Sequence, residues 1–371
     1  MTARGERIID LDVTRGVALI GVCVMNYHGY LINRGATPGD GFWARQFDPW
    51  NGPLSTRFAA TFVVVAGMGI SLLTRRSTAG SDRGAISADR WVLVRRGVLL
   101  YSFGFFLNWV WPGTILFFYG AYFMVGAVLF TLRSRWLVLI GVTAALAAAG
   151  LKWWVVDRTR QGRPPAWLVQ GNAAAHTSPR DLVLDTFVRG THPLLPWLVF
   201  LCAGMVLGRV LPFATRVRWW LTGFGVGCVV LGYVLHAVLQ WDDVLRSTRP
   251  FDRGLLYTLI AMGVALVAVC VVGAAAHATS RSTLTHMLAV TGRTTLSLYV
   301  LHVLVFDLVV DWLEWVKPAG LVTSLSFALV FWMVAIVAAN AWALWQPVGP
   351  LEWLYRRFSD NRHPTSLNVS H

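Results

Sequence analysis

Long apolar runs, separated by short charged segments, dominate the chain. A helix that crosses a bilayer needs about 20 mostly apolar residues. Ten runs meet this requirement, at residues 14–32, 57–74, 92–111, 114–132, 136–156, 193–210, 218–240, 254–276, 287–310 and 320–344. The pattern predicts an all-α fold: a polytopic integral membrane helical bundle of about ten transmembrane helices, forming a single membrane domain over residues 1–371. The third and fourth runs are joined only by Trp111-Pro112-Gly113, which predicts a tight helical hairpin.

The positions of Lys and Arg between the runs indicate an orientation. Positive residues are enriched in cytoplasmic connections. With a cytoplasmic N-terminus, most of the Lys and Arg outside the runs fall on the inner side, including the Arg group between residues 75 and 96. We therefore expect both termini in the cytoplasm. The long segments 33–56 and 157–191 are then outer loops, and connections of that length often carry function.

Composition agrees with a membrane protein and excludes several other classes. Of the 371 residues, 56% are hydrophobic and 13% are charged, whereas about a quarter of the residues of a typical soluble domain are charged. A soluble enzyme, a disulfide scaffold, a coiled coil and a disordered regulator are thereby excluded. The net charge of +14 lies mostly between apolar runs, so it indicates topology and not a nucleic-acid partner.

Smaller features add little chemistry. The four cysteines lie inside apolar runs without C-x-x-C spacing, so we expect buried thiols, with neither a disulfide nor a metal site. The first run is expected to stay in the protein, because no small-residue cleavage site follows it. Gly204-x-x-x-Gly208 predicts close helix contact within the bundle.

Polar side chains inside the first and ninth runs are the candidate site, because such groups are costly in a bilayer. Counting from Arg15 at 1.5 Å per residue, Asn26 is about 16 Å deep and His28 about 20 Å. Counting from Arg293, His302 is about 14 Å deep.

The ninth run also carries Tyr299, three residues before His302 and so on the same helix face, and Asp307, which lies nearer the outer side. Two helices therefore place polar groups at similar depths. The alternative for each histidine is a hydrogen bond that only joins helices.

Several stretches together resemble the transmembrane acyltransferase superfamily, in the branch that contains heparan-α-glucosaminide N-acetyltransferase and bacterial membrane proteins of unknown function. These stretches are Arg7–Leu19 followed by Asn26, Trp50-Asn51-Gly52, Ala66-Gly67-Met68-Gly69, Gly190–Trp197, Gly204–Arg209, Gly292–Tyr299 with His302, and Gly349–Leu354.

The resemblance implies transfer of an acyl group from cytoplasmic acyl-CoA to an amine or hydroxyl of an extracytoplasmic sugar or envelope glycoconjugate. Acetyl is the acyl group expected. The resemblance also implies the plasma membrane of a bacterium, acetyl-CoA or another acyl-CoA as co-substrate, no metal, and a lipid bilayer as surroundings. A homodimer is compatible with it.

The same resemblance suggests roles for individual residues. In the glucosaminide branch, an Asn at the end of the first helix and a His just before Trp-Asn-Gly act at the centre. Asn26 matches the Asn, but the second stretch is Gln46-Phe47-Asp48-Pro49 and holds no His. In more distant sugar O-acyltransferases, a His stands where Asn26 stands here. We therefore expect His28 to act as the base, oriented by Asp48.

The remaining expected contacts fall into two groups. Substrate contacts are expected from Trp50, Asn51, His192, Tyr299, His302 and Asp307, and contacts to the acyl-CoA from Arg15 and Arg293.

Two other classes stay open. A non-enzymatic transporter, or a membrane protein that binds a lipid or small molecule, would also place a polar pocket between helices. No internal repeat or paired broken helices favour the transporter. A purely structural partner would tolerate loss of both His28 and His302.

Overall fold

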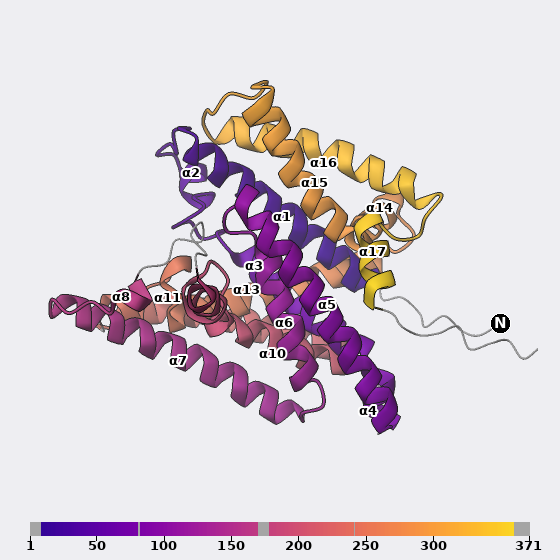
Figure 1. Cartoon of the computed structure of the whole chain (residues 1–371), viewed down its shortest axis with the longest axis horizontal. Coiled ribbons are helices and arrows are strands. Elements are labelled where there is room, and N and C mark those ends of the chain that lie inside the picture. Colours follow the sequence, from indigo (N-terminus) through magenta and orange to yellow (C-terminus); the bar gives the residue numbers. More distant parts are fainter. Residues whose placement is uncertain (1–8, 81, 170–177, 241, 360–371) are drawn as a thin grey trace, which may run out of the picture.

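The computed structural model describes residues 9–80, 82–169, 178–240 and 242–359, and every regular element within these ranges is a helix (Figure 1). The longer helices are α1 (Ile9–Asn33), α3 (Arg57–Leu73), α5 (Arg83–Val110), α6 (Ile115–Leu129), α7 (Ser134–Arg160), α10 (Leu194–Val210), α11 (Thr215–Val238), α13 (Leu255–Ala278), α14 (Thr283–Arg293), α15 (Thr295–Phe306) and α16 (Leu321–Ala343).

Short helices occupy the connections. They are α2 (Phe42–Gln46), α4 (Arg75–Gly80), α8 (Ala166–Val169), α9 (Pro179–Leu184), α12 (Asp243–Arg246), α17 (Pro350–Ser359), the 3-10 turn η2 (Pro250–Asp252), and the π-helical stretches η1 (Asp185–Arg189) and η3 (Asp307–Trp312). In Figure 1, α2 and α8 lie at one end of the molecule, whereas α4 and α17 lie at the other. We call these the outer end and the inner end. Residues 170–177 of the expected outer loop 157–191 lie outside the described residues.

Several helices have the length and composition of membrane spans. Five are long and apolar enough: Ser134–Arg160, Thr215–Val238, Leu255–Ala278, Thr295–Trp312 and Leu321–Ala343. A sixth is formed by Pro179–Arg189 and Leu194–Val210 if this pair, bent by 57°, counts as one span. The chain is thus all-helical in its described parts and of multi-pass membrane type. About ten spans and cytoplasmic termini stay predictions.

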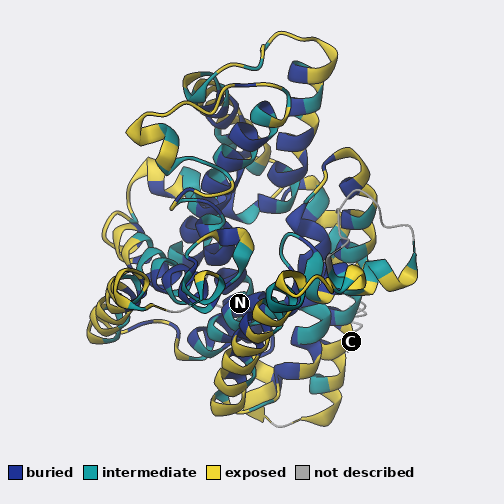
Figure 2. Cartoon of the chain, turned by 90° about the vertical axis from the view of Figure 1, so that its left-hand side faces the viewer, coloured by how far each residue is buried: buried dark blue, intermediate teal, exposed yellow. Residues whose placement is uncertain are grey.

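Small residues let the central helices pack closely. A Cβ built on Gly204 of α10 would lie 2.0 Å from the carbonyl oxygen of Val64 on α3, so only glycine fits at this crossing. A Cβ on Gly292 of α14 would lie 1.7 Å from the carbonyl oxygen of Asp12 on α1. The Gly204-x-x-x-Gly208 pattern is therefore a contact within the bundle, as predicted. Figure 2 shows the resulting buried centre, with exposed residues on the outer helices.

The predicted single helix 287–310 is wrong, because the structure divides it into α14 and α15 at Thr294. The Thr294 backbone leaves the helical conformation, and its hydroxyl donates back to the carbonyls of Val290 and Thr291. Other boundaries also move: α5 begins at Arg83 instead of 92, and α7 runs to Arg160 instead of 156. Charged residues continue these two helices past their apolar parts.

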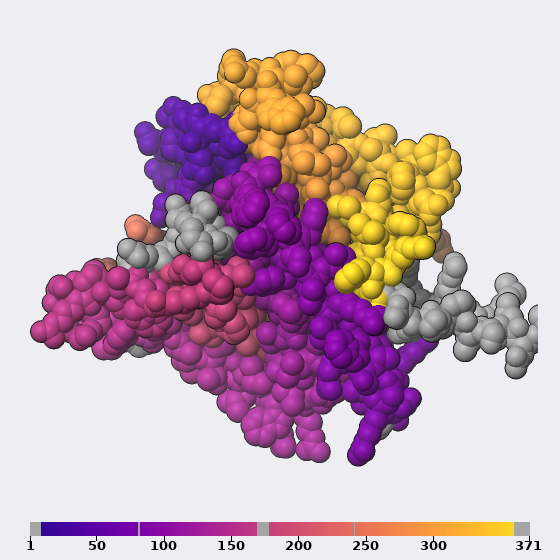
Figure 3. Space-filling view, viewed as in Figure 1, coloured from indigo at the N-terminus to yellow at the C-terminus, as the bar shows by residue number. Residues whose placement is uncertain are grey.

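A carboxylate from the C-terminal α17 stabilises the start of α15. Glu352 Oε1 accepts hydrogen bonds from the backbone N–H of Leu296 at 2.5 Å and of Ser297 at 3.2 Å, and Oε2 accepts from the Ser297 hydroxyl at 2.5 Å. These N–H groups have no partner within the helix itself. Burial raises the pKa of Glu352 above its ordinary value of 4.5, against the effect of these hydrogen bonds. Figure 3 shows this C-terminal part packed against the α5 region.

Candidate functional site

A cavity of about 2060 Å³ opens at the inner end of the helices and has a strongly cationic wall. Among the described residues, seven arginines and four acidic residues line it: Arg15, Arg75, Arg76, Arg96, Arg218, Arg293, Arg356, Asp10, Asp12, Asp89 and Glu352. We call it the inner cavity. The two arginines predicted to contact acyl-CoA, Arg15 and Arg293, are both in this wall.

The inner cavity changes character with depth. Leu100, Phe62, Leu116 and Phe123 make its far part apolar. Arg15 is part of the same wall, and its Nη1 is 3.5 Å from Asp12 Oδ1 and 3.4 Å from the carbonyl oxygen of Gly292. An arginine-lined mouth with an apolar interior suits an elongated molecule that has an anionic head.

A second cavity of about 540 Å³ opens near the outer ends of the same helices. We call it the outer cavity. It is lined by Asn26, Trp50, His192 and Tyr299 of the predicted site, and by residues that the sequence analysis did not single out, such as Arg34 and Trp111. Its wall combines aromatic rings with hydrogen-bonding groups, a composition common in sites for small polar ligands.

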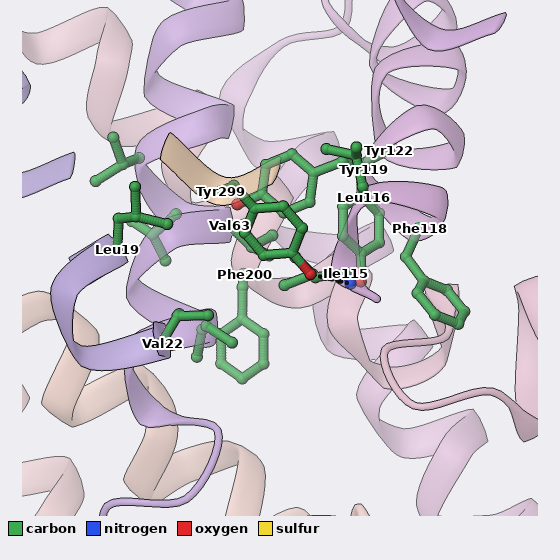
Figure 4. Packing of buried hydrophobic residues seen from close by; sticks show 14 of the residues in the cluster. Leu19, Val22, Val63, Ile115, Leu116, Phe118, Tyr119, Tyr122, Phe200 and Tyr299 are labelled. Atoms are coloured by element: carbon green, nitrogen blue, oxygen red, sulfur yellow. Dashed lines mark hydrogen bonds between the residues drawn. The ribbon is translucent and has the colours of Figure 1, made fainter. Parts of the chain in front are cut away.

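The two cavities share two wall residues, Tyr299 of α15 and Ile115 at the start of α6. The Tyr299 hydroxyl accepts a hydrogen bond from the Ile115 N–H at 3.2 Å and lies 3.0 Å from the Thr114 hydroxyl. Figure 4 shows the Tyr299 ring pointing toward Ile115, with this contact drawn as a dashed line. These two side chains therefore form the part of the wall where the cavities approach each other.

His302 lies beside this wall and is joined to Asn26. Its Nε2 is 3.2 Å from Asn26 Nδ2, and its Nδ1 contacts the carbonyl oxygen of Tyr299. A carbonyl only accepts hydrogen bonds, so Nδ1 carries the proton. Nε2 is then the acceptor, and Asn26 donates to it. The ring is fully buried, and Asn26 separates its basic nitrogen from the outer cavity.

His28 faces a different direction. Its Nδ1 is 3.0 Å from the Ser324 hydroxyl on α16, and it is not among the described residues that line either cavity. Asp48 Oδ1 accepts from the backbone N–H of Trp50 at 2.8 Å and of Asn51 at 3.0 Å. Within the described part of the chain, the hydrogen bonds of His28 and Asp48 thus go to other partners and not to each other.

The other predicted contacts are spread over the outer part. His192 Nδ1 is 3.0 Å from the Thr191 hydroxyl, and its ring meets that of Trp197 edge to face at 4.6 Å. Asn51 and Asp307 are not among the described residues that line the outer cavity. The structure therefore places Asn26, Trp50, His192 and Tyr299 in the described wall of the outer cavity, with His302 behind Asn26, and leaves the remaining outer residues apart from it.

Trp111, which was not predicted as a site residue, is almost completely buried. Its ring stacks on Tyr30 with 3.4 Å between centroids and meets the His302 ring edge to face at 5.5 Å. Its place in the Trp111-Pro112-Gly113 hairpin was the available signal, because a large aromatic residue in a tight membrane turn has to pack against a neighbouring helix.

The fold and the cavities define the class of protein. It is a helical protein of multi-pass membrane type, and its helices enclose a cationic inner cavity and an aromatic outer cavity. Comparison with known proteins adds relatives without a described activity. A family model described as "Protein of unknown function (DUF418)" matches residues 210–361. The chain is 24% identical to "Uncharacterized protein YeiB" of Escherichia coli (strain K12), over 95% of this chain and 96% of that protein.

Proposed function

We propose that this protein is a membrane-embedded acyltransferase. It moves an acyl group from acyl-CoA in the inner cavity to an amine or hydroxyl of an extracytoplasmic sugar or envelope glycoconjugate in the outer cavity. Acetyl is the acyl group that we propose. The observation that carries the proposal is the pair of cavities at opposite ends of the helices, with Tyr299 and Ile115 in both walls. Such an arrangement lets two substrates from opposite sides meet without an open pore.

The donor side has the chemistry that acyl-CoA needs. Guanidinium groups form strong charge-assisted hydrogen bonds to phosphates. Arg15 and Arg293 line the inner cavity together with five further arginines, which outnumber its acidic residues. The apolar depth of the cavity accepts the rest of a long donor, and it directs the acyl end toward Tyr299.

The Asn26–His302 pair supplies the proton chemistry. Acyl-CoA brings a thioester: the acceptor oxygen or nitrogen bonds to the carbonyl carbon, the C–S bond breaks, and CoA leaves as the thiol with the acceptor's proton. We assign the intermediate carrier of that proton to His302 Nε2, because its other nitrogen is already protonated. The Asn26 amide, which lies between Nε2 and the outer cavity, has to move aside for the acceptor to reach this nitrogen. A base of this kind contributes about 10²- to 10⁴-fold to a rate. We favour His302 over His28 for this role because His302 is hydrogen-bonded to Asn26, which lines the outer cavity, whereas His28 is hydrogen-bonded to Ser324, which is not among the lining residues.

Asn26 has a defined part in this scheme. In the neutral state its amide N–H donates to Nε2 at 3.2 Å. Once Nε2 takes up a proton, two donors would face each other, so the amide must turn and present its oxygen. The turn points the Asn26 NH₂ group away from His302 and toward the outer cavity, where it can donate to the reacting acceptor.

Two measurements on the detergent-purified protein test the proposal. Acetyl-CoA and CoA should both raise the thermal unfolding temperature, and label from [¹⁴C]acetyl-CoA should appear on envelope sugars or lipids in reconstituted vesicles. The absence of stabilisation by acetyl-, succinyl- and longer acyl-CoA would refute the donor site. Passage of an unmodified solute across the vesicle membrane would instead support the transporter alternative.

A further inference from the structure

One tyrosine in the inner cavity has a buried hydroxyl without a hydrogen bond. Tyr119 lies on α6, one turn after Ile115, and lines the inner cavity. Its side chain is 6% exposed, and its hydroxyl finds no partner among the described residues. A buried hydroxyl usually has a partner, and leaving it unpaired is costly.

Neighbouring tyrosines show that this is unusual within the same bundle. The Tyr122 hydroxyl donates to the carbonyl oxygen of His192 at 2.6 Å, and that of Tyr27 donates to the carbonyl oxygen of His302 at 3.0 Å. The Tyr299 hydroxyl has both Thr114 and Ile115. Of these four tyrosines, Tyr119 is the one whose hydroxyl has no hydrogen-bond partner among the described residues, and it lines the inner cavity.

The Tyr119 ring is held in place. It packs against Phe62 of α3 at 5.4 Å between centroids and against Tyr122 at 5.7 Å (Figure 4 shows Tyr119 beside Tyr122). Leu116 lines the same part of the cavity. Because these contacts fix the ring, the hydroxyl has little freedom to find an acceptor within the protein, and a molecule in the cavity that Tyr119 lines can supply one.

The position of Tyr119 narrows the identity of that acceptor. The arginines of the inner cavity suit the phosphates of a donor, whereas Tyr119 lies on the same helix as Ile115, one turn from the wall shared with the outer cavity. Phe62, which packs against the Tyr119 ring, and Leu116 are apolar wall residues of the same cavity. The group that reaches this depth is the acyl end of the donor, and its hydrogen-bond acceptor is the carbonyl oxygen.

We propose that the Tyr119 hydroxyl donates a hydrogen bond to the thioester carbonyl oxygen of the acyl donor. The inference rests on the proposed function, since it names how the donor's reactive end is recognised. The hydrogen bond selects an acyl thioester over a thioether of the same size, and it holds the carbonyl carbon near Tyr299.

The test compares two ligands and three proteins. Acetyl-CoA and S-ethyl-CoA differ in that the thioether lacks the carbonyl oxygen. Dissociation constants are measured for both, together with adenosine 3′,5′-bisphosphate as a probe of the arginine-lined mouth. The proteins are the wild type, Tyr119→Phe, and Tyr122→Phe, which is the same substitution on the same helix at a residue outside the described lining of the inner cavity.

The wild type should bind acetyl-CoA about tenfold more tightly than S-ethyl-CoA, the value of one good hydrogen bond. Tyr119→Phe should remove that preference and leave bisphosphate binding unchanged, whereas Tyr122→Phe should keep the preference. Tyr119→Phe should fold normally, because the hydroxyl it removes has no partner in the protein.

Each other result overturns the inference. Equal binding of the two ligands by the wild type would refute it even if Tyr119→Phe did not fold. A preference retained in Tyr119→Phe, or an equal loss of bisphosphate affinity, would refute it while leaving the acyl-CoA site intact. If the wild type bound none of the three probes, the proposed function itself would fail, and the inference with it.

Discussion

His302 and His28 provide a matched pair of substitutions that separates chemistry from structure. Both rings are fully buried, and among the described residues each has one side-chain hydrogen bond to another helix: 3.2 Å from His302 to Asn26 and 3.0 Å from His28 to Ser324. Glutamine at either position fills similar space and keeps hydrogen-bonding groups, but it cannot take up a proton. The two substitutions should therefore cost similar stability, about 1–3 kcal/mol each for an imperfectly replaced buried hydrogen bond.

Their effects on acetyl transfer should differ strongly. Loss of a general base lowers a rate by about 10²- to 10⁴-fold, which corresponds to about 3–5 kcal/mol in activation free energy. His302→Gln should show that loss, whereas His28→Gln should stay within a few-fold of the wild type. The assay is the initial rate of [¹⁴C]acetyl transfer in vesicles, normalised to correctly folded protein, with the unfolding temperature measured on the same samples.

A larger loss of activity in His28→Gln than in His302→Gln would refute the assignment. It would return the role of base to His28, with Asp48 as its orienting group. Equal activity losses that follow equal losses of unfolding temperature would show that both histidines only join helices.

Three further predictions follow from packing and charge. Gly204→Ala should lower the unfolding temperature by several degrees, because the new methyl would lie 2.0 Å from the backbone oxygen of Val64, and Gly223→Ala, with nothing within 4 Å, should leave it unchanged. Tyr299→Phe should cost about 1–3 kcal/mol in thermal or denaturant unfolding, since a buried backbone N–H loses its acceptor. A carboxyl group whose pKa is raised on folding stabilises the fold at a pH below its unfolded pKa, and this contribution is lost as the pH rises through its folded pKa. The wild type should therefore lose stability relative to Glu352→Gln as the pH rises above 4.5, so the unfolding temperature of Glu352→Gln minus that of the wild type should grow. A difference that stays constant with pH would contradict the argument from the pKa of Glu352.

The depth of the central polar groups could be predicted from the sequence, because the rise per residue of a helix is fixed. Counting from Arg15 and Arg293 gave depths for Asn26 and His302 that differ by about 2 Å, and the two side chains are in contact in the structure. The hairpin at Trp111-Pro112-Gly113 likewise follows from local residues, since α5 ends at Val110 and α6 begins at Ile115.

The direction of His28 needed the positions of other helices. Two residues along a helix amount to about 200° of rotation, so Asn26 and His28 cannot both face one cavity of this kind. That much is contained in the sequence. Which of the two faces the cavity depends on where α15 and α16 pack around α1, and no local pattern specifies this.

The break at Thr294 has a cause that is distant along the chain. Apolar residues continue from 287 to 310 and favour one helix, but the N–H groups freed by a break at Thr294 are satisfied by Glu352. A buried acid in a short C-terminal helix therefore allows α15 to begin where it does. The start of α15 in turn sets the positions of Tyr299 and His302 on that helix. The hydrogen bonds of Glu352 at the inner end therefore help to position these two residues of the site.

The difference between Tyr119 and Tyr122 shows why the positions of the cavities could not be predicted from the sequence. Both tyrosines stand in one apolar run, three residues apart, and both are buried. The Tyr122 hydroxyl donates to the carbonyl oxygen of His192, whereas Tyr119 lines the inner cavity and its hydroxyl has no partner among the described residues. A ligand atom that accepts a hydrogen bond from Tyr119 would satisfy a group that the described protein leaves unpaired.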